Sequence, residues 1–390
     1  MWEKYLLKRQ PFDIFKHTHE MADRREEWDR IMHQLRSALG GEGCRFLILQ
    51  GDYGMGKSFM LEQIYVKTKK GDIPRAFAVK NILAGAPIRA MASEPITPKF
   101  GLDLVCRLFS NIKVEEYNEI FKRASLERLD SEAKNVFNAF KSGQERESSL
   151  FDITKDIRRI VISFLKGESL KATELGKIGV RSPLKDSPTA MSYFFNFLKV
   201  LKQAEYDSML ILLDEFEYIM NTQGEKKITQ ILNTFKEIFD DFGLYEGREQ
   251  GQRAKVIFFF AISPGGWEKL LDLRRTSVKK TGGGGIAPFL DRISNKDIIG
   301  LKPFYEEDTF ELVRLRLEEN RTNTPQNPFF PFTNACIKLV YSVSENNPRH
   351  ILEYCGILLE DALDVGLSEI DEKSAKEILG KYGIDAEHKS

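Results

Sequence analysis

The stretch Gly51-Asp52-Tyr53-Gly54-Met55-Gly56-Lys57-Ser58 has the spacing G-x-x-x-x-G-K-S, which is typical of a phosphate-binding loop, or P-loop. Residues 45–50 before it form an apolar run that predicts a buried strand, and residues 59–66 after it predict a helix. The glycines let backbone N–H groups turn inward around phosphates, and the helix N-terminus adds partial positive charge. We therefore expect a strand–loop–helix unit that binds a nucleotide. The alternative is a glycine-rich turn that binds nothing.

The chemistry of the P-loop assigns roles to individual residues. Lys57 is expected to reach the β- and γ-phosphates, and the Ser58 hydroxyl is expected to ligate Mg²⁺. ATP and Mg²⁺ are therefore the expected cofactors. The residues expected to contact the nucleotide in this stretch are Gly51, Asp52, Tyr53, Gly54, Met55, Gly56, Lys57, Ser58 and Phe59.

The composition is that of a globular protein, with 42% apolar and 30% charged residues. Lys plus Arg and Asp plus Glu number 58 each, so the net charge is zero and any contact with nucleic acid must come from a local patch. We expect no membrane contact, because no stretch approaches the ~20 apolar residues of a membrane helix. Residues 1–5 lack the apolar run of a signal peptide, and the widely spaced cysteines resemble reduced core residues, so we expect a cytoplasmic protein.

A second informative stretch is the apolar run 209–213, which Asp214 and Glu215 follow directly. Such a run fits a strand buried on both faces of a parallel sheet, and ligands bind at the carboxyl ends of these strands. This Walker B pattern predicts that Asp214 holds Mg²⁺ through water and that Glu215 polarises the attacking water. The alternative role for Asp214 is to cap the following helix.

A further strand is predicted over residues 255–262, and it ends at Ser263. Ser263 is the candidate for a polar side chain beside the γ-phosphate, and the alternative is a turn serine before a proline. Residues 76–81 and 297–301 predict two more strands of the same sheet. Residues from about 113 to 190 are charged and helical in pattern, which indicates an insertion into a minimal P-loop domain.

Beyond the strand that ends at Ser263 we expect a basic, glycine-rich loop over residues 274–285, which includes Gly282 to Gly285. Its cations are able to touch nucleic-acid phosphates, which position a protein without specifying sequence. The alternative is a solvated loop. The cations in question are Arg274, Arg275, Lys279 and Lys280.

From residue 304 onward the pattern is helical, with a helix opened by three acids at 306–308 and a third helix that starts at Asn347. Asn347 has the character of an N-cap and Pro348 that of the first helical residue. We therefore predict an α/β P-loop domain over residues 1–303, a small all-helical lid over 304–382 and a tail over 383–390.

The P-loop, the Walker B pattern, the Ser263 strand end and Asn347-Pro348-Arg349, in this order, resemble the AAA+ ATPases, and most of all their replication-initiator and origin-recognition branch. The stretch from Lys166-Gly167-Glu168 through Gly179-Val180 to Leu210–Glu217 also resembles the accessory ATP-binding proteins of BREX-type phage-defence islands. The AAA+ resemblance spans about residues 11–380. It implies a parallel P-loop sheet followed by a helical lid.

The AAA+ resemblance also implies roles for residues outside the P-loop. Arg349 is the expected sensor arginine of the lid, and Arg292 is the expected arginine finger for a neighbouring subunit, with Arg274 and Arg275 as competitors. Phe12 and residues 23–26 lie where the family binds adenine, although the usual glycine is Asp23 here. Asn81 is implied as a hydrogen-bond partner that holds Glu215 inactive.

Together these features predict an AAA+ ATP hydrolase that assembles or remodels a protein or nucleoprotein complex, in the settings of phage defence or DNA transactions. A homo-oligomer and a protein partner are expected. We do not expect sequence-specific recognition of DNA, since we expect no winged-helix domain after the lid. One rival is an ATP-dependent switch of oligomerisation or partner binding with little hydrolysis. A second rival is a P-loop kinase, against which the Asp214–Glu215 pair argues.

Overall fold

The computed structural model describes residues 2–13, 24–41, 43–80, 100–145, 153–218, 224–244, 251–281 and 286–385. The chain divides into two compact units. We name them the sheet unit and the lid unit and describe each by itself. The sheet unit comprises Ile31–Gln50 and Met60–Ile299, and the lid unit comprises Met1–Arg30, Gly51–Phe59 and Gly300–Ser390.

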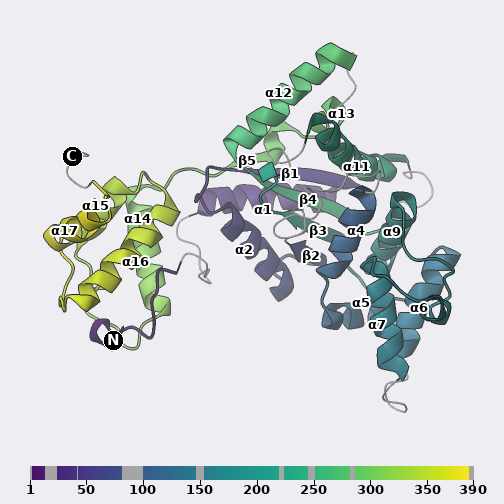
Figure 1. Ribbon diagram of the computed structural model, residues 1–390, viewed down its shortest axis with the longest axis horizontal. Coiled ribbons are helices and arrows are strands. Elements are labelled where there is room, and N and C mark those ends of the chain that lie inside the picture. Colours follow the sequence, from purple (N-terminus) through teal and green to yellow (C-terminus); the bar gives the residue numbers. More distant parts are fainter. Residues whose placement is uncertain are drawn as a thin grey trace. The chain divides into compact units, whose positions relative to one another are not determined.

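A five-stranded sheet of order β2-β3-β4-β1-β5 forms the centre of the sheet unit (Figure 1). The pairs β1–β4, β3–β4 and β2–β3 are parallel. Gln50 pairs with Ile262 and Leu213 pairs with Phe260, so β1, β3 and β4 end at the same edge of the sheet. The strands are β1 (Cys44–Gln50), β2 (Ala76–Lys80), β3 (Ser208–Leu213), β4 (Lys255–Ile262) and β5 (Ile298–Gly300).

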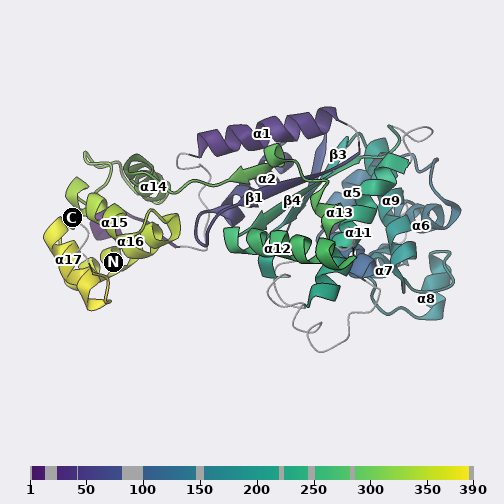
Figure 2. The same cartoon turned by 90° about the horizontal axis from the view of Figure 1, so that it is seen from above.

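The apolar runs form these strands because both faces of the sheet are covered by helices. All six residues of β3 are buried, as a central parallel strand requires. Figure 2 shows α1 (Arg25–Gly40) and α2 (Lys57–Lys70) along one side of the sheet, with α11 (Glu225–Leu244) and α13 (Ala287–Leu290) on the other. The main core includes every second residue of the strands, for example Phe46, Ile48, Met209, Ile211, Phe258 and Phe260.

The regular elements of the predicted insertion are all helices in the part that the structure describes, with short turns between them, and the insertion shares the main core of the sheet unit. Its aromatic side chains interlock: the Phe121 ring lies 4.9 Å from Phe140 and 5.3 Å from Phe137, between ring centroids. The helices between residues 100 and 203, which include the insertion, are α4 (Phe100–Ser110), α5 (Val114–Arg123), α6 (Ser131–Glu145), α7 (Ile153–Leu165), α8 (Ala172–Lys177) and α9 (Ser187–Gln203).

The prediction of a basic loop over residues 274–285 is wrong for residues 274–281, which are helical. Residues Pro264–Thr281 form helix α12, because Trp267, Leu270 and Leu271 recur at helical spacing and pack against the core. Arg274 and Arg275 therefore project from a helix. Of the other predicted features here, the Lys279 and Lys280 side chains and residues 282–285 lie outside the described part of the chain.

The lid unit consists mainly of α14 (Glu306–Glu319), α15 (Asn334–Val343), α16 (Pro348–Asp364) and α17 (Glu372–Lys381). Its core also contains a segment from the other end of the sequence. Tyr5, Leu7 and Phe12 are buried among the lid helices, and the Tyr5 hydroxyl donates to the Leu367 carbonyl at 2.8 Å. Contacts between residues so far apart in the sequence leave no local pattern in it. Our sequence-based boundaries therefore placed residues 2–13 with the ATPase domain.

Candidate nucleotide-binding site

The P-loop leaves the carboxyl end of β1 and leads into α2, as the motif predicts. Gly54 and Gly56 have φ values of 84° and 92°, in the left-handed region that glycine adopts without strain. The Lys57 side chain is 9% exposed, and its Nζ donates to the Gly51 and Asp52 carbonyls at 2.7 and 3.1 Å. The loop thus has the tight glycine turns that a phosphate cradle needs, and its lysine is directed into the loop. Nucleotide phosphates fit this geometry.

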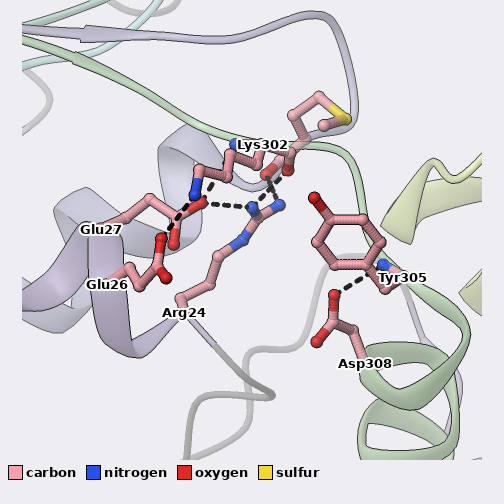
Figure 3. Close-up of polar contacts among 7 residues, drawn as sticks. Arg24, Glu26, Glu27, Lys302, Tyr305 and Asp308 are labelled. Atoms are coloured by element: carbon pink, nitrogen blue, oxygen red, sulfur yellow. Dashed lines mark hydrogen bonds and ion pairs between the residues drawn. The ribbon is translucent and has the colours of Figure 1, made fainter.

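Arg24 braces the P-loop from the start of α1, within the lid unit (Figure 3). It is 4% exposed, and its Nη2 donates to the Met55 carbonyl at 3.0 Å. Its Nη1 donates to Glu27 Oε1 at 2.9 Å and to the Lys302 carbonyl. The guanidinium carbon also lies 4.6 Å from the centre of the Phe304 ring. One buried cation therefore joins the P-loop to the segment that leads into the lid helices.

Glu27 and Glu26 complete this junction (Figure 3). Glu27 Oε1 accepts from the Lys302 backbone N–H at 3.0 Å, and Lys302 Nζ lies 2.5 Å from Glu26 Oε2. The hydrogen bond between these two side chains lowers the pKa of Glu26 and raises that of Lys302. Because the ion pair between Glu26 and Lys302 is exposed, we expect it to add little to the stability of the fold. The segment 24–26 was predicted to lie near the adenine; Asp23 lies outside the described residues, and the adenine contact stays a prediction.

Helix α16 reaches the P-loop through its first residues, again within the lid unit. Asn347 is the N-cap: its Oδ1 accepts from the Arg349 N–H at 3.0 Å, as its sequence predicts. Its Nδ2 donates to the Tyr53 carbonyl at 2.8 Å. The Arg349 guanidinium lies over the Tyr53 ring, 4.7 Å from its centre. The contact is close, since a Cβ added to Gly54 would lie 2.4 Å from Asn347 Oδ1. The predicted sensor arginine is thus beside the P-loop.

The Walker B residues form a strained turn at the end of β3, in the sheet unit. Asp214 Oδ1 accepts from the Glu215 N–H at 2.9 Å, and Glu215 has a φ of 50°. A left-handed backbone is rare for residues other than glycine and marks sites where the surroundings impose it. Here the constraint comes from Phe216, whose N–H donates to the Ala261 carbonyl at 3.0 Å and whose ring lies 4.6 Å from that of Phe260. The Glu215 side chain is exposed.

Ser263 lies at the end of β4 and starts helix α12. Its Oγ accepts from the Gly266 N–H at 3.1 Å, which is the contact of a helix cap. Gly266 in turn approaches the Walker B turn, because a Cβ added there would lie 2.7 Å from the Glu217 Cβ. Ser263 therefore lies beside the Asp214–Glu217 segment, and a contact with the γ-phosphate stays a prediction.

Arg292, the predicted finger, is paired within its own chain. Its Nε and Nη2 donate to Asp240 Oδ1 at 2.8 and 2.5 Å, and its guanidinium carbon lies 5.5 Å from the centre of the Phe239 ring. Partial burial acts to raise the pKa of Asp240, but hydrogen bonds from Lys236 and Arg292 lower it below its ordinary value. The competing arginines are paired as well. Arg274 contacts Asp291, and Arg275 contacts Asp272.

Four further predictions concern Mg²⁺, the adenine contact, the partner of Glu215 and membranes. Ser58 is exposed in the first turn of α2 and Asp214 is half-buried, and oxygen donors of these types suit Mg²⁺. Phe12, a predicted adenine contact, lies in the lid core with its ring 5.7 Å from that of Phe332. Asn81, the predicted partner of Glu215, lies outside the described residues. Among the helices that the structure describes, none has the length and apolar character needed to cross a membrane.

Comparisons with known proteins show which families and folds this chain resembles. A family model described as BREX system ATP-binding protein BrxC/D matches residues 148–265. An uncharacterized HTH-type transcriptional regulator of Methanocaldococcus jannaschii is 25% identical over 388 residues, 99% of this chain and 75% of that protein. The ORC2 protein of Aeropyrum pernix in its ADPNP–ADP complexes has a TM-score of 0.51 and 13% identity, over 99% of this chain and 73% of its own. Its ADP form has a TM-score of 0.50 and 13% identity, over 96% and 73%.

These structural matches show the fold of the chain: an ORC-like AAA+ fold, with a five-stranded sheet and a C-terminal helical region. The predicted fold class is thereby confirmed. The predicted resemblances to the initiator branch and to BREX ATP-binding proteins are also confirmed, the second over a match that contains the Walker B turn and Ser263.

Proposed function

We propose that this chain, which has the ORC-like AAA+ fold, binds ATP with Mg²⁺ and hydrolyses it to drive assembly or remodelling of a protein or nucleoprotein complex. The BrxC/D match and the ORC-like fold support the ATP-binding part. The observation that carries the proposal is the contact between the P-loop and the start of α16. Two hydrogen-bonding and cationic residues, Asn347 and Arg349, lie directly on a loop whose glycine turns suit phosphates.

In the proposed reaction Lys57 and Arg349 stabilise negative charge on the γ-phosphate, and Ser58 and Asp214 hold the metal ion. The metal ion neutralises charge on the phosphates when it is bound. Glu215 orients or deprotonates the attacking water, for which its exposed carboxylate is suited. Ser263 supplies a hydroxyl at the end of β4.

Two other functions remain as rivals with distinct products. A switch would bind ATP and change its oligomeric state or partner, with negligible release of phosphate. The strain stored at Glu215 favours hydrolysis over this switch, because such strain is typical of active-site residues. A small-molecule kinase would instead transfer the phosphate to an organic acceptor.

The test measures ATP binding by calorimetry and phosphate release by the full chain. We expect Lys57→Ala to weaken ATP binding strongly, because it removes a charge-assisted phosphate contact, and Lys70→Ala at the exposed end of α2 to have no such effect. Glu215→Gln should bind ATP but release phosphate at least ~10²-fold more slowly, whereas Glu237→Gln on α11 should not. Unchanged turnover in Glu215→Gln would reject the assigned role. A phosphorylated organic product would favour the kinase.

The assembly part of the proposal depends on Arg292 acting on a neighbouring subunit. An arginine finger contributes roughly 10³–10⁵-fold in rate in other NTPases. Arg292→Ala should then bind ATP but hydrolyse it slowly, and mixing it with Lys57→Ala protein should restore part of the activity. The contact with Asp240 would have to open for this role. A rate per subunit that does not change on dilution, with no rescue on mixing, would contradict it.

We propose contact with nucleic acid only as a sequence-independent contribution of α12, through Arg274, Arg275, Lys279 and Lys280. The ion pairs of Arg274 and Arg275 with neighbouring acids reduce the charge that they offer. The BrxC/D match supports phage defence as the setting, and the protein partner of such a system would be the expected binding partner.

A further inference from the structure

Tyr53 is an unusual residue at the tip of the P-loop. Its side chain is 68% exposed, the largest exposed fraction among the large apolar side chains of the described residues. An exposed aromatic ring is an ordinary surface feature when it makes no specific contact. Tyr53, in contrast, makes contacts through both its ring and its backbone.

Three observations fix the ring beneath a cation. The Arg349 guanidinium lies 4.7 Å from the ring centre, within the range of a cation–π contact. The Asn347 side chain holds the Tyr53 carbonyl at 2.8 Å. Gly54, the next residue, lies so close to α16 that a Cβ there would be 2.9 Å from the Arg349 Cβ. All three contacts lie within the lid unit.

Arg349 has one guanidinium and two candidate partners. The first is the Tyr53 ring, and the second, under the proposed function, is the terminal phosphate of ATP. A planar guanidinium that stacks on a ring can bind a phosphate only with N–H groups that lie in its own plane, and a γ-phosphate outside that plane requires Arg349 to leave the ring. A charge-assisted contact with phosphate is stronger than an exposed cation–π contact. Arg349 therefore binds the phosphate when ATP is present, but the net gain in binding free energy is smaller because the contact with the ring is lost.

We propose that Tyr53 is a specificity-determining residue that competes with the γ-phosphate for Arg349 and thereby lowers the preference of the site for ATP over ADP. This inference rests on the proposed function, since it assumes that nucleotide binds at the P-loop. ADP has no γ-phosphate and leaves Arg349 on the ring. ATP binding must displace the contact, so the ring reduces the affinity for ATP alone.

The test is a set of affinities, measured by calorimetry on the full chain with Mg²⁺, for ADP and for a non-hydrolysable ATP analogue. Tyr53→Ala should bind the ATP analogue about 2–5-fold more tightly, which is the fold-change expected from removal of an exposed cation–π contact. Its affinity for ADP should change by less than that. Tyr53→Phe retains a ring and should tighten binding of the analogue less than Tyr53→Ala does.

Two controls separate competition from a general change in the loop. In an Arg349→Ala background, Tyr53→Ala should no longer tighten binding of the analogue. The cation for which the Tyr53 ring and the γ-phosphate compete is then absent. Tyr382→Ala, which removes another exposed tyrosine of the lid unit, should not shift the ratio of the two affinities.

Equal effects of Tyr53→Ala on both nucleotides, weaker binding of the analogue, or an effect that persists without Arg349 would each overturn the inference and leave ATP binding intact. If the wild-type chain shows no nucleotide binding that depends on Lys57, the proposed function fails, and this inference fails with it.

Discussion

The P-loop and the Walker B turn both contain left-handed backbone, but they place different types of residue there. Both follow the carboxyl end of a parallel strand, and both need a left-handed backbone. The P-loop uses glycine at the two positions, Gly54 and Gly56, with φ values of 84° and 92°. The Walker B turn uses Glu215, with a φ of 50°. An L-residue in this region costs roughly 1–2 kcal/mol that glycine avoids.

The difference shows which part of each turn carries chemistry. A P-loop presents backbone N–H groups, so its side chains are dispensable where the chain turns. At the Walker B turn the side chain itself is needed, so the strain must be offset by the surroundings. Phe216, buried against Phe260 and bonded to Ala261, is the residue that offsets it. The P-loop takes its support from polar contacts with Arg24 and Asn347.

The largest effect should come from removal of the Phe216 ring. Phe216→Ala would leave a cavity beside Phe235 and Phe260, and losses of this kind cost about 3–5 kcal/mol. Denaturant unfolding followed by circular dichroism should show this loss, with a smaller one for Phe216→Leu. A change below about 1 kcal/mol would mean that packing of Phe216 does not support the turn.

The next effect concerns the glycines of the P-loop. Gly54→Ala adds both backbone strain and a clash with Asn347, whereas a Cβ at Gly56 meets nothing within 4 Å. We expect about 10²-fold weaker ATP binding for Gly54→Ala and about 10-fold for Gly56→Ala, since each 1.4 kcal/mol is a factor of ten. Calorimetry measures both. Equal losses would show that contact with α16 is irrelevant to the loop.

A smaller effect should distinguish strain from chemistry at Glu215. Glu215→Gly and Glu215→Ala both remove the carboxylate, so both should lose turnover. Glycine should relieve the left-handed strain, which makes Glu215→Gly about 1 kcal/mol more stable than Glu215→Ala. Thermal unfolding of the two variants gives the comparison. If Glu215→Ala is the more stable, the turn is not strained in solution.

The smallest effect lies away from both turns, at the pair of Asp240 and Arg292. The folded pKa of Asp240 is below its ordinary value, so the pair stabilises the fold above about pH 4 and this contribution is lost as the pH falls through the folded pKa. The pair is partly solvated, so we expect less than about 1 kcal/mol. Asp240→Asn should unfold with a weaker pH dependence than the wild type below pH ~4. Identical acid profiles would contradict this.

Short-range patterns predicted the strands, the P-loop, the Walker B turn and the cap at Asn347, because apolar runs and capping residues act within a few positions. The helix over Pro264–Thr281 was missed since its paired cations and the following glycines at 282–285 suggested a loop, although Trp267 and Leu270 repeat at helical spacing. Other features join residues that are distant in the chain, among them the contact of Arg292 with Asp240 and that of Arg349 with Tyr53. Such contacts arise from tertiary packing and leave no local signal.

The segment at residues 2–13 has a consequence for how the protein is made. Lys4 Nζ donates to the Gly366 carbonyl at 2.6 Å, and Tyr5 and Leu7 complete an apolar core that α14 to α17 build. A ribosome synthesises this segment hundreds of residues before the lid helices that it packs against. The segment therefore has no packing partners while the sheet unit is being synthesised. The P-loop gains its contacts with Asn347 and Arg349 at the same late stage. During synthesis, therefore, a nascent chain can bury its sheet well before its P-loop is complete.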